Sequence, residues 1–259
     1  IVESPLQAQF SVLSISQYRQ FTVQQNPIDE QPSEGSKKLY IIFGGLKAGV
    51  GMPPFEFVKA ANILTEHKIF VRDFSQAWYH RGLPGISNNL TETSDYLRER
   101  INTYKPEETV LIGNSMGGFA AILFASMLSN CRAIAISPQT YLGIGKRLVN
   151  RERRWRSELR KTYFYSFFGE RRYDLASINP KNSSWHADIL LSANHARDLS
   201  HAKNVAHIPQ IRIHKFDCKS HRLVKKLRDV GMLNKILLGE IPPTNRSGVI
   251  PIADQDDPY

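Results

Sequence analysis

The stretch Thr109-Val110-Leu111-Ile112-Gly113-Asn114-Ser115-Met116-Gly117-Gly118 decides how this sequence folds. An apolar strand-like run enters the pattern G-x-S-x-G, and a helix-like run of small and apolar residues leaves it. In that setting the serine sits on a tight turn, and its neighbours two positions away must be glycine because side chains there would clash. We interpret Ser115 as a nucleophile at the end of a buried strand. The alternative is a glycine-rich turn whose serine only caps the helix.

Strand and helix patterns alternate on both sides of this turn. The expected strands cover residues 39–43, 68–73, 109–113, 131–137, 189–192 and 210–216, and the expected helices cover 53–64, 91–104, 117–128, 199–205 and 221–230. Short apolar strands that alternate with helices are typical of a parallel sheet covered on both faces. We predict one α/β domain over residues 1–259, with a doubly wound, mostly parallel sheet and a site at the carboxyl ends of its strands.

The two ends of the chain have weaker patterns. Residues 9–15 and 21–25 alternate and are expected to be edge strands, whereas residues 26–37 read as a loop. Residues 240–259 are rich in proline and aspartate and are expected to form a loose tail.

From Leu39 to Gly231 the order of elements, together with the turn at Ser115, resembles the α/β-hydrolase superfamily, and within it serine hydrolases of the esterase, lipase and thioesterase kind. The resemblance implies a serine nucleophile, a backbone oxyanion hole, and partners that follow along the chain as acid, then histidine. It implies hydrolysis or acyl transfer on an ester, thioester or amide. It identifies no subfamily and no substrate.

The histidine and the acid are sought after the last two expected strands. His221 lies in the loop after residues 210–216, where its ring can reach the nucleophile; His195 and His201, in the preceding crossover, are alternatives. Asp198 is the single acidic residue between Leu190 and Phe216, and it could equally cap a helix. Asp217 is the rival acid, although it stands close to His221 in the sequence. We predict Ser115, His221 and Asp198 as the catalytic residues.

Backbone N–H groups are expected to hold the oxyanion. The resemblance assigns one donor to Met116, the residue after the nucleophile, and the other to the loop after the first buried strand, at Gly45 or Leu46. Phe43 stands here where many esterases have the histidine of a His-Gly-Gly-Gly run. The backbone chemistry does not depend on that side chain.

The charge of +10 is concentrated in one segment. Residues 145–172 hold ten basic and three acidic residues, and aromatic residues stand among them. In the superfamily this region often carries a lid, so residues 139–182 are expected to be a lid or cap insert. Arginine beside aromatic rings can bind an anionic acyl substrate. We therefore predict substrate contacts from Arg151, Arg154 and Trp155, and from Trp78 and Tyr79 in an earlier loop. The alternative for the basic segment is an amphipathic helix that packs its aromatic residues on the body and leaves its arginines in water. The alternative for Trp78 and Tyr79 is a packed loop.

Other classes of function fit the sequence less well. No apolar run is long enough to span a membrane, no nucleic-acid recognition motif is present, and no His, Cys or Asp spacing predicts a metal. We expect no cofactor, two reduced thiols and a cytoplasmic location. The expected partner is a small-molecule or carrier-bound acyl substrate, and the oligomeric state stays open. The alternative function is a catalytically inactive scaffold that binds an acidic partner through the basic segment.

Overall fold

A computed structural model describes residues 26–46, 55–165, 169–178 and 184–252. Its strands form one sheet in the order β1-β3-β2-β4-β5-β6-β7-β8. They are β1 Ile28–Gln31, β2 Lys38–Phe43, β3 His67–Val71, β4 Glu108–Asn114, β5 Cys131–Ile136, β6 His186–Ser192, β7 Ile211–Phe216 and β8 Val249–Ile250. Every neighbouring pair is parallel except β1 with β3. The predicted doubly wound, mostly parallel sheet is therefore confirmed.

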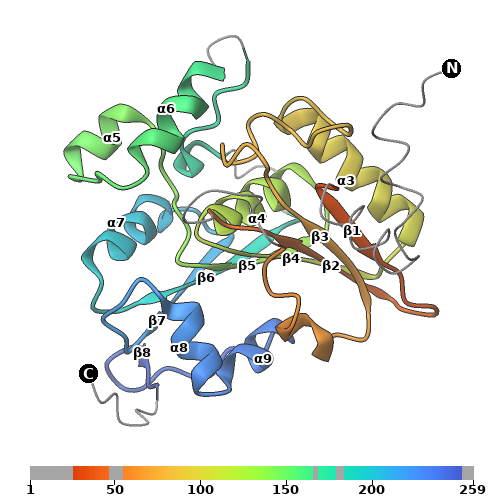
Figure 1. Cartoon of the computed structure of the whole chain (residues 1–259). Helices are drawn as coiled ribbons and strands as arrows, with labels where there is room; N and C mark the ends of the chain where they lie inside the picture. Colours follow the sequence, from red (N-terminus) through yellow and green to blue (C-terminus); the bar gives the residue numbers. More distant parts are fainter. Residues whose placement is uncertain (1–25, 47–54, 166–168, 179–183, 253–259) are drawn as a thin grey trace, which may run out of the picture.

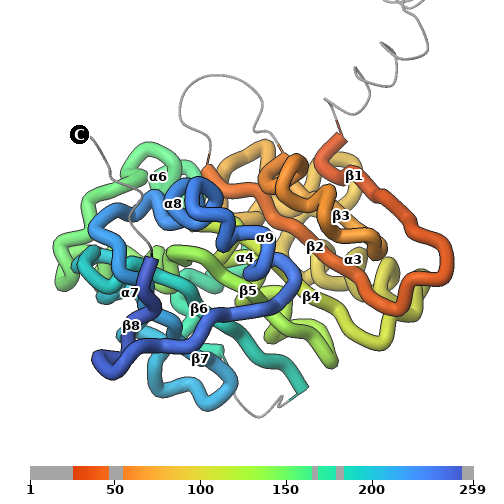
Figure 2. Tube along the Cα trace, turned by 90° about the horizontal axis from the view of Figure 1, so that it is seen from below, coloured from red at the N-terminus to blue at the C-terminus, as the bar shows by residue number. Residues whose placement is uncertain are grey.

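Helices cover both faces of the sheet (Figures 1 and 2). On one face lie α3 Leu90–Tyr104, α4 Met116–Met127 and α7 Ala196–Val205. On the other face lie α8 Leu223–Asp229, α9 Met232–Leu237 and a short 3₁₀ turn, η1 Ala60–Ile63. Each layer has its own apolar core, because a strand buried on both faces alternates its side chains between the two. None of the helices in the described residues is long and apolar enough to cross a membrane.

The segment expected as a lid or cap, residues 139–182 and here called the basic insert, follows β5 in the chain. It contains α5 Ile144–Val149, α6 Arg156–Tyr165 and the 3₁₀ turn η3 Leu175–Ser177. In Figure 1, α5 and α6 stand outside the two helix layers. A bridge between Tyr141 and Asp174 ties the two ends of the insert together. This segment is therefore part of the connection between β5 and β6.

Two segments that the sequence favoured as irregular contain strands. Ile28–Gln31 forms β1 inside the expected loop 26–37; its flanking prolines, Pro27 and Pro32, suit an edge strand, and Ile28 is its one buried residue. The expected loose tail over 240–259 is wrong in its middle. Val249 and Ile250 form β8 beside β7, and Ile250 is completely buried. A two-residue strand between prolines leaves no periodic pattern to detect.

Several boundaries also differ. Of the helix expected over residues 53–64, the described residues contain one short 3₁₀ turn, η1 Ala60–Ile63. The helix expected over 221–230 is α8, which begins at Leu223, so His221 precedes it in a loop. The helix expected over 91–104 begins one residue earlier, and Asn89 caps it by accepting from the Glu92 N–H at 2.8 Å. The strands expected at 9–15 and 21–25 lie outside the described residues.

Candidate active site

Ser115 occupies the sharp turn between β4 and α4. Its backbone lies at φ 55° and ψ −114°, a conformation that residues other than glycine rarely adopt. The turn is held by the Ser115 N–H, which donates to the Ile136 carbonyl at 2.9 Å. A Cβ added to Gly113 would lie 2.1 Å from the Gly117 backbone, and one added to Gly117 would lie 2.3 Å from the Phe43 carbonyl oxygen. The glycines are thus required by close backbone packing, as the sequence predicted.

Asp198 and His221 come together at the same end of the sheet. His221 Nδ1 lies 2.8 Å from Asp198 Oδ1, although 23 residues separate them along the chain. Asp198 stands in the first turn of α7, after β6, and His221 follows β7. The rival acid Asp217 instead accepts from Asn194 Nδ2 at 3.1 Å. The geometry therefore pairs the acid and the histidine that we selected from the sequence.

Asp198 is buried beside two imidazoles and one guanidinium. His195 Nδ1 lies 3.1 Å and an Arg154 guanidinium nitrogen 3.9 Å from its Oδ1. Burial on its own raises the pKa of Asp198, but the hydrogen bond from His221 and the charges of His221, His195 and Arg154 outweigh it and lower the pKa. Asp198 is consequently held as a carboxylate, the form needed to orient an imidazole. His195, and not Asp198, is the N-cap residue of α7.

Sequence reasoning missed Gln139, which contacts the nucleophile. Gln139 follows β5, is buried, and donates from Nε2 to Ser115 Oγ. Its Oε1 accepts from Trp78 Nε1 at 3.0 Å. Because an indole N–H can only donate, the amide oxygen must face Trp78, and the NH₂ must face Ser115. Ser115 Oγ is therefore the acceptor, and its own proton stays available for another partner. Within the described residues no hydrogen bond joins Ser115 to His221.

The buried carboxylate of Asp73 fixes the loop after β3, which carries Trp78. Asp73 accepts the backbone N–H groups of Ser75, Ala77 and Tyr79 at 2.9, 2.6 and 2.9 Å. These bonds stabilise the left-handed backbone of Trp78, at φ 52°, and of Tyr79, at φ 63°. The expectation that Trp78 and Tyr79 line the substrate entrance needs correction, since both side chains are fully buried. Trp78 orients Gln139 instead.

The candidate oxyanion loop follows β2. Tyr79 fixes it, since its hydroxyl donates to the Gly44 carbonyl at 2.9 Å. The Gly45 N–H already donates to the carboxyl of Glu56, whose Oε1 would lie 2.8 Å from a Cβ at Gly45. Burial raises the pKa of Glu56 to about 7. The sequence left Gly45 and Leu46 as alternatives for the second oxyanion donor. Because the Glu56 carboxyl occupies the Gly45 N–H, Leu46 is the better candidate. The other predicted donor, Met116, begins α4 beside Ser115.

The basic insert reaches the site through residues 152–155. Trp155 lies between Trp78 and His221, with ring centroids 6.5 and 6.2 Å away. Arg154 stacks on Trp155 and binds the buried carboxylate of Glu152 with both Nε and Nη2. The Arg154 guanidinium, which we expected to contact the substrate, is thus paired with Glu152. Arg151 is exposed.

His201 and His214 have structural partners. His201 is buried, accepts from the Thr140 N–H at 3.1 Å through Nδ1, and stacks on Tyr141. His214 bonds to Asp188 at 2.9 Å. In the part of the chain that the structure describes, the one cluster with metal-ligand spacing is His195, Asp198 and His221. The hydrogen bonds among its members already account for that cluster.

Both cysteines are free thiols. Cys131 is buried in the core, and burial raises the pKa of its thiol to about 12. Cys218 is half-buried in the loop that carries His221, where its Sγ accepts from the Ser220 N–H at 3.5 Å.

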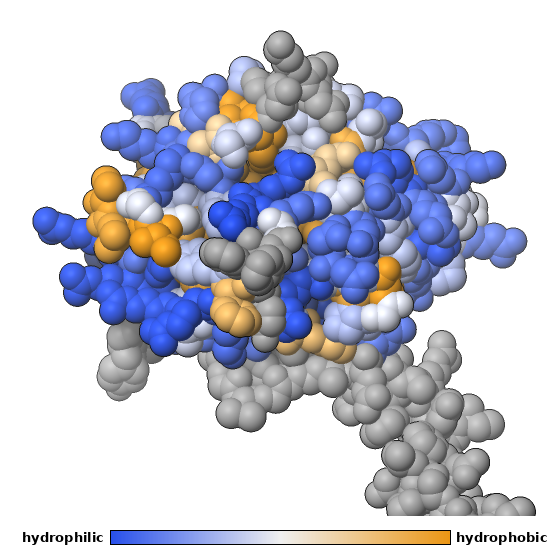
Figure 3. All heavy atoms as spheres, turned by 90° about the horizontal axis from the view of Figure 1, so that it is seen from above, coloured by the Kyte–Doolittle hydropathy of each residue, from blue (hydrophilic) through white to orange (hydrophobic). Residues whose placement is uncertain are grey.

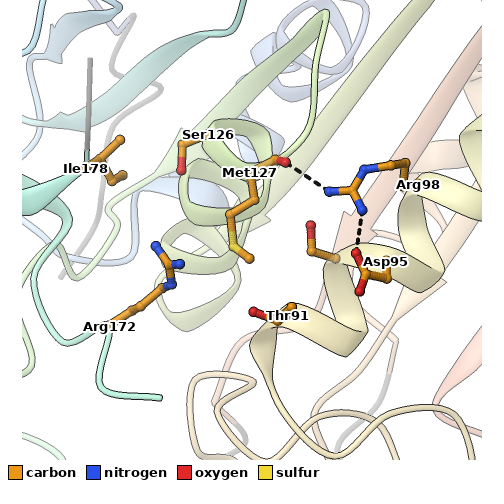
Figure 4. Close-up of a pocket in the computed structure, with 8 residues that line it drawn as sticks. Thr91, Asp95, Arg98, Ser126, Met127, Arg172 and Ile178 are labelled. Carbon is orange, nitrogen blue, oxygen red and sulfur yellow. Dashed lines mark hydrogen bonds and ion pairs between the residues drawn. The ribbon is translucent and has the colours of Figure 1, made fainter. Parts of the chain in front are cut away.

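A cavity of about 310 Å³ lies away from these residues (Figure 4). It is lined by Thr91, Ser94, Asp95, Arg98, Ser126, Met127, Arg172 and Ile178. Ser126 and Met127 stand at the far end of α4 from Ser115, and a rise of about 1.5 Å per residue separates the two ends by roughly 15 Å. Arg98 is bound to Asp95 and to the Met127 carbonyl (Figure 4). We assign this cavity no part in the candidate site.

The order of the strands, the strained turn at Ser115 and the Asp198–His221 pair after β6 and β7 are those of the α/β-hydrolase fold. The expected resemblance is therefore confirmed for the fold. Solved structures with this fold include the capsule O-acetyltransferase of Neisseria meningitidis serogroup A, at 13% identity and a TM-score of 0.56 over 79% of this chain and 89% of that one. A variant of that enzyme was solved in complex with CoA.

Two further structures have the same fold. A chain of the Glycosylation Associate Protein (Gap123) complex from Streptococcus agalactiae shares 15% identity, with a TM-score of 0.55 over 81% of this chain and 43% of that chain. FphF, a fluorophosphonate-binding serine hydrolase of Staphylococcus aureus, shares 12% identity, with a TM-score of 0.51 over 81% and 92%. No protein-family model and no curated protein matches the sequence.

Proposed function

We propose that this protein is a serine acyl-transfer enzyme that forms an acyl-enzyme on Ser115. The observation that carries the proposal is the strained backbone of Ser115, at φ 55°, on a turn whose two flanking glycines admit no side chain. A helix cap would not require that conformation, whereas a nucleophile presented at the end of a sheet does. The buried Asp198–His221 pair at the same sheet end supports it.

The proposed mechanism assigns one role to each group. His221 accepts the Ser115 proton as Oγ attacks the acyl carbonyl, and it returns that proton to the leaving group. Asp198 accepts from Nδ1 of His221, which fixes the ring orientation and stabilises the imidazolium. The N–H groups of Met116 and Leu46 are the proposed donors to the tetrahedral oxyanion. Water or an acceptor hydroxyl then resolves the acyl-enzyme, with His221 acting again as the base.

Gln139 is the proposed positioning residue for the nucleophile. Its NH₂ donates to a lone pair of Ser115 Oγ, and its oxygen is anchored on Trp78. This arrangement holds Oγ while leaving the hydroxyl proton free to pass to His221. In the tetrahedral intermediate Oγ is bonded to the acyl carbon that also carries the oxyanion, and we propose that the Gln139 amide N–H then turns from Oγ to this oxyanion. A buried donor in that position stabilises charge that forms only in the transition state.

Acyl transfer to a hydroxyl is the second candidate outcome. It is favoured by one observation, namely that a capsule O-acetyltransferase, solved with CoA in a variant, shares the fold over most of its length. We propose an ester or thioester donor, and Trp155 beside His221 is the proposed neighbour of the acyl or acceptor group. Arg151 remains a proposed contact for an anionic substrate, because its side chain is exposed at the insert.

Fluorophosphonate labelling tests the proposal. The wild-type protein should label at Ser115, and Ser115→Ala should abolish labelling with unchanged circular dichroism. Incubation with p-nitrophenyl acetate or acetyl-CoA should add one acetyl group to the intact mass, and peptide mapping should place it on Ser115. Added hydroxyl acceptors that shorten the lifetime of the acyl-enzyme would identify a transferase. A folded protein that never labels or acylates would overturn the proposal in favour of an inactive scaffold.

A further inference from the structure

The short helix α5 has its polarity reversed. Ile144, Leu148 and Val149 are 59%, 73% and 82% exposed, while Arg147 is the buried residue of the helix. The guanidinium of Arg147 points inward and donates to the Arg154 carbonyl at 2.7 Å. A helix that packs on a protein core places its apolar residues inward. The apolar face of α5 therefore contributes little to folding.

The three apolar side chains form a small protruding patch. Ile144 and Leu148 are four residues apart, so they lie on one face of the helix, and Val149 adjoins them at its end. Seen from above, an apolar patch surrounded by strongly hydrophilic atoms lies on the side of the molecule where α5 stands in Figure 1 (Figure 3). Isolated exposed apolar residues are common, but three adjacent ones on a reversed helix require an explanation.

Unpaired cations follow the patch directly along the chain. The exposed basic residues are Arg151, Arg153, Arg156, Arg160 and Lys161. None of them makes an ion pair in the described parts of the chain. Of the two acids in residues 151–161, Glu152 is turned inward onto Arg154, and Glu158 is half-buried in α6. Six basic residues against two acids leave this segment with a net positive charge.

We propose that α5 and the basic residues 151–161 together form a docking surface for anionic membranes. Short helices with protruding apolar side chains and flanking Lys or Arg insert at the boundary between headgroups and acyl chains. The cations are attracted to acidic lipids, and the apolar side chains leave water on insertion. This inference goes beyond the acyl-transfer function and does not depend on Ser115.

Charge and shape favour a membrane over another protein copy. Two copies that meet through this face would bring two segments of net positive charge together, which opposes association. Three protruding residues on a convex helix also offer far less than the roughly 800 Å² per partner of a stable protein interface. Docking here would bring the candidate site close to the bilayer, because Trp155 in the same segment lies beside His221.

Vesicle flotation with the full chain tests the docking surface. Vesicles of phosphatidylcholine alone and of phosphatidylcholine with about one third phosphatidylglycerol would be compared at low and high salt. The wild type should float with the anionic vesicles at low salt and be released by high salt. The triple variant Ile144→Ser, Leu148→Ser, Val149→Ser should bind at least about tenfold more weakly. The variant Arg151→Gln, Arg153→Gln, Arg156→Gln, Arg160→Gln should lose binding to a similar extent.

Two controls separate this surface from general effects. Val58, Ile63 and Leu238 are also exposed, at 38%, 41% and 38%, but lie elsewhere, so replacing all three with serine should leave flotation unchanged. Ser115→Ala should also float normally, whether or not the acyl-transfer proposal holds. The inference is overturned if the wild type floats with neither vesicle, or if the Ile144, Leu148 and Val149 variant floats like the wild type. It is equally overturned if the patch instead drives a dimer, visible by sedimentation, that the triple serine variant abolishes.

Discussion

At the scale of single residues, the orientation of one buried amide links the core to the nucleophile. Asp73 shapes the loop that carries Trp78, the Trp78 indole fixes the Gln139 oxygen, and the Gln139 NH₂ meets Ser115 Oγ. Each step is determined by which atoms can donate and which can accept. The position of Oγ therefore depends on residues from three different strand ends.

Gln139→Ala should lower kcat roughly 100-fold and leave KM nearly unchanged, since the amide is proposed to act on the nucleophile and the oxyanion. Trp78→Phe should act in the same direction with a smaller effect, because the amide can then rotate. Steady-state hydrolysis of p-nitrophenyl acetate and thermal melting would be measured together. Loss of activity that merely follows loss of thermal stability in both variants would contradict the positioning role.

His221→Ala should lower kcat by several orders of magnitude, because no other group would accept the Ser115 proton. His195→Ala should lower kcat at most about tenfold, because His195 contacts Asp198 and not the nucleophile. The two variants are matched, since both remove an imidazole from the same carboxylate. The assignment would be wrong if His195→Ala were the more damaging change in initial-rate assays.

The sequence could predict some of these residues and not others. Ser115 was visible because the two glycines that its turn requires, Gly113 and Gly117, stand two residues to either side of it in the sequence. Asp198 stood out because it is the single acid in its crossover. Gln139 had no signal, because its role arises from contacts with Trp78 and Ser115 at separations of 61 and 24 residues. Glu152 was hidden among arginines, although it neutralises Arg154.

At the scale of elements, the edges of the sheet were harder to predict than its centre. Central strands are continuous apolar runs, since both faces are covered. The edge strands β1 and β8 have four and two residues and stand next to prolines. Each contains one buried apolar residue, Ile28 in β1 and Ile250 in β8. Such short strands exist because a neighbouring strand offers hydrogen bonds, and not because their own sequence favours extension.

Ile250→Ala should lower the free energy of unfolding by about 2–5 kcal/mol, because the side chain is completely buried. It belongs to the same apolar core as Leu237 and Phe216, on the face of the sheet that α8 and α9 cover. Val249→Ala should have a smaller effect, since Val249 is only half-buried. Urea denaturation followed by circular dichroism provides the measurement. Equal, negligible effects of both changes would mean that β8 is not part of the cooperative fold.

At the scale of the whole molecule, proton binding at one buried carboxyl should couple stability to pH. The pKa of Glu56 is raised to about 7 by burial. A group whose pKa is raised in the folded state stabilises the protein below its unfolded pKa, and this contribution is lost as pH rises through the folded pKa. Glu56 should therefore destabilise the fold progressively between about pH 4.5 and 7.

Glu56→Gln should remove this dependence, since glutamine mimics the neutral carboxyl and can still accept from the Gly45 N–H. At pH 4 the two proteins should be about equally stable, and at pH 8 the variant should be more stable by on the order of 3 kcal/mol. The difference between variant and wild type across pH cancels the contribution of His80, whose pKa is lowered to about 4 by burial. A wild type that gains stability relative to the variant as pH rises would refute the assignment.

The different burial of the two thiols should allow a spectroscopic probe to be attached to the native protein at a single position. Cys131 is shielded by the core and stays protonated, whereas Cys218 is accessible in the loop that carries His221. A maleimide fluorophore or a spin label should therefore attach at one position only, without any engineered cysteine. Because that position is three residues from His221, changes in emission or line shape would report in real time when an acyl donor enters and when the acyl group departs.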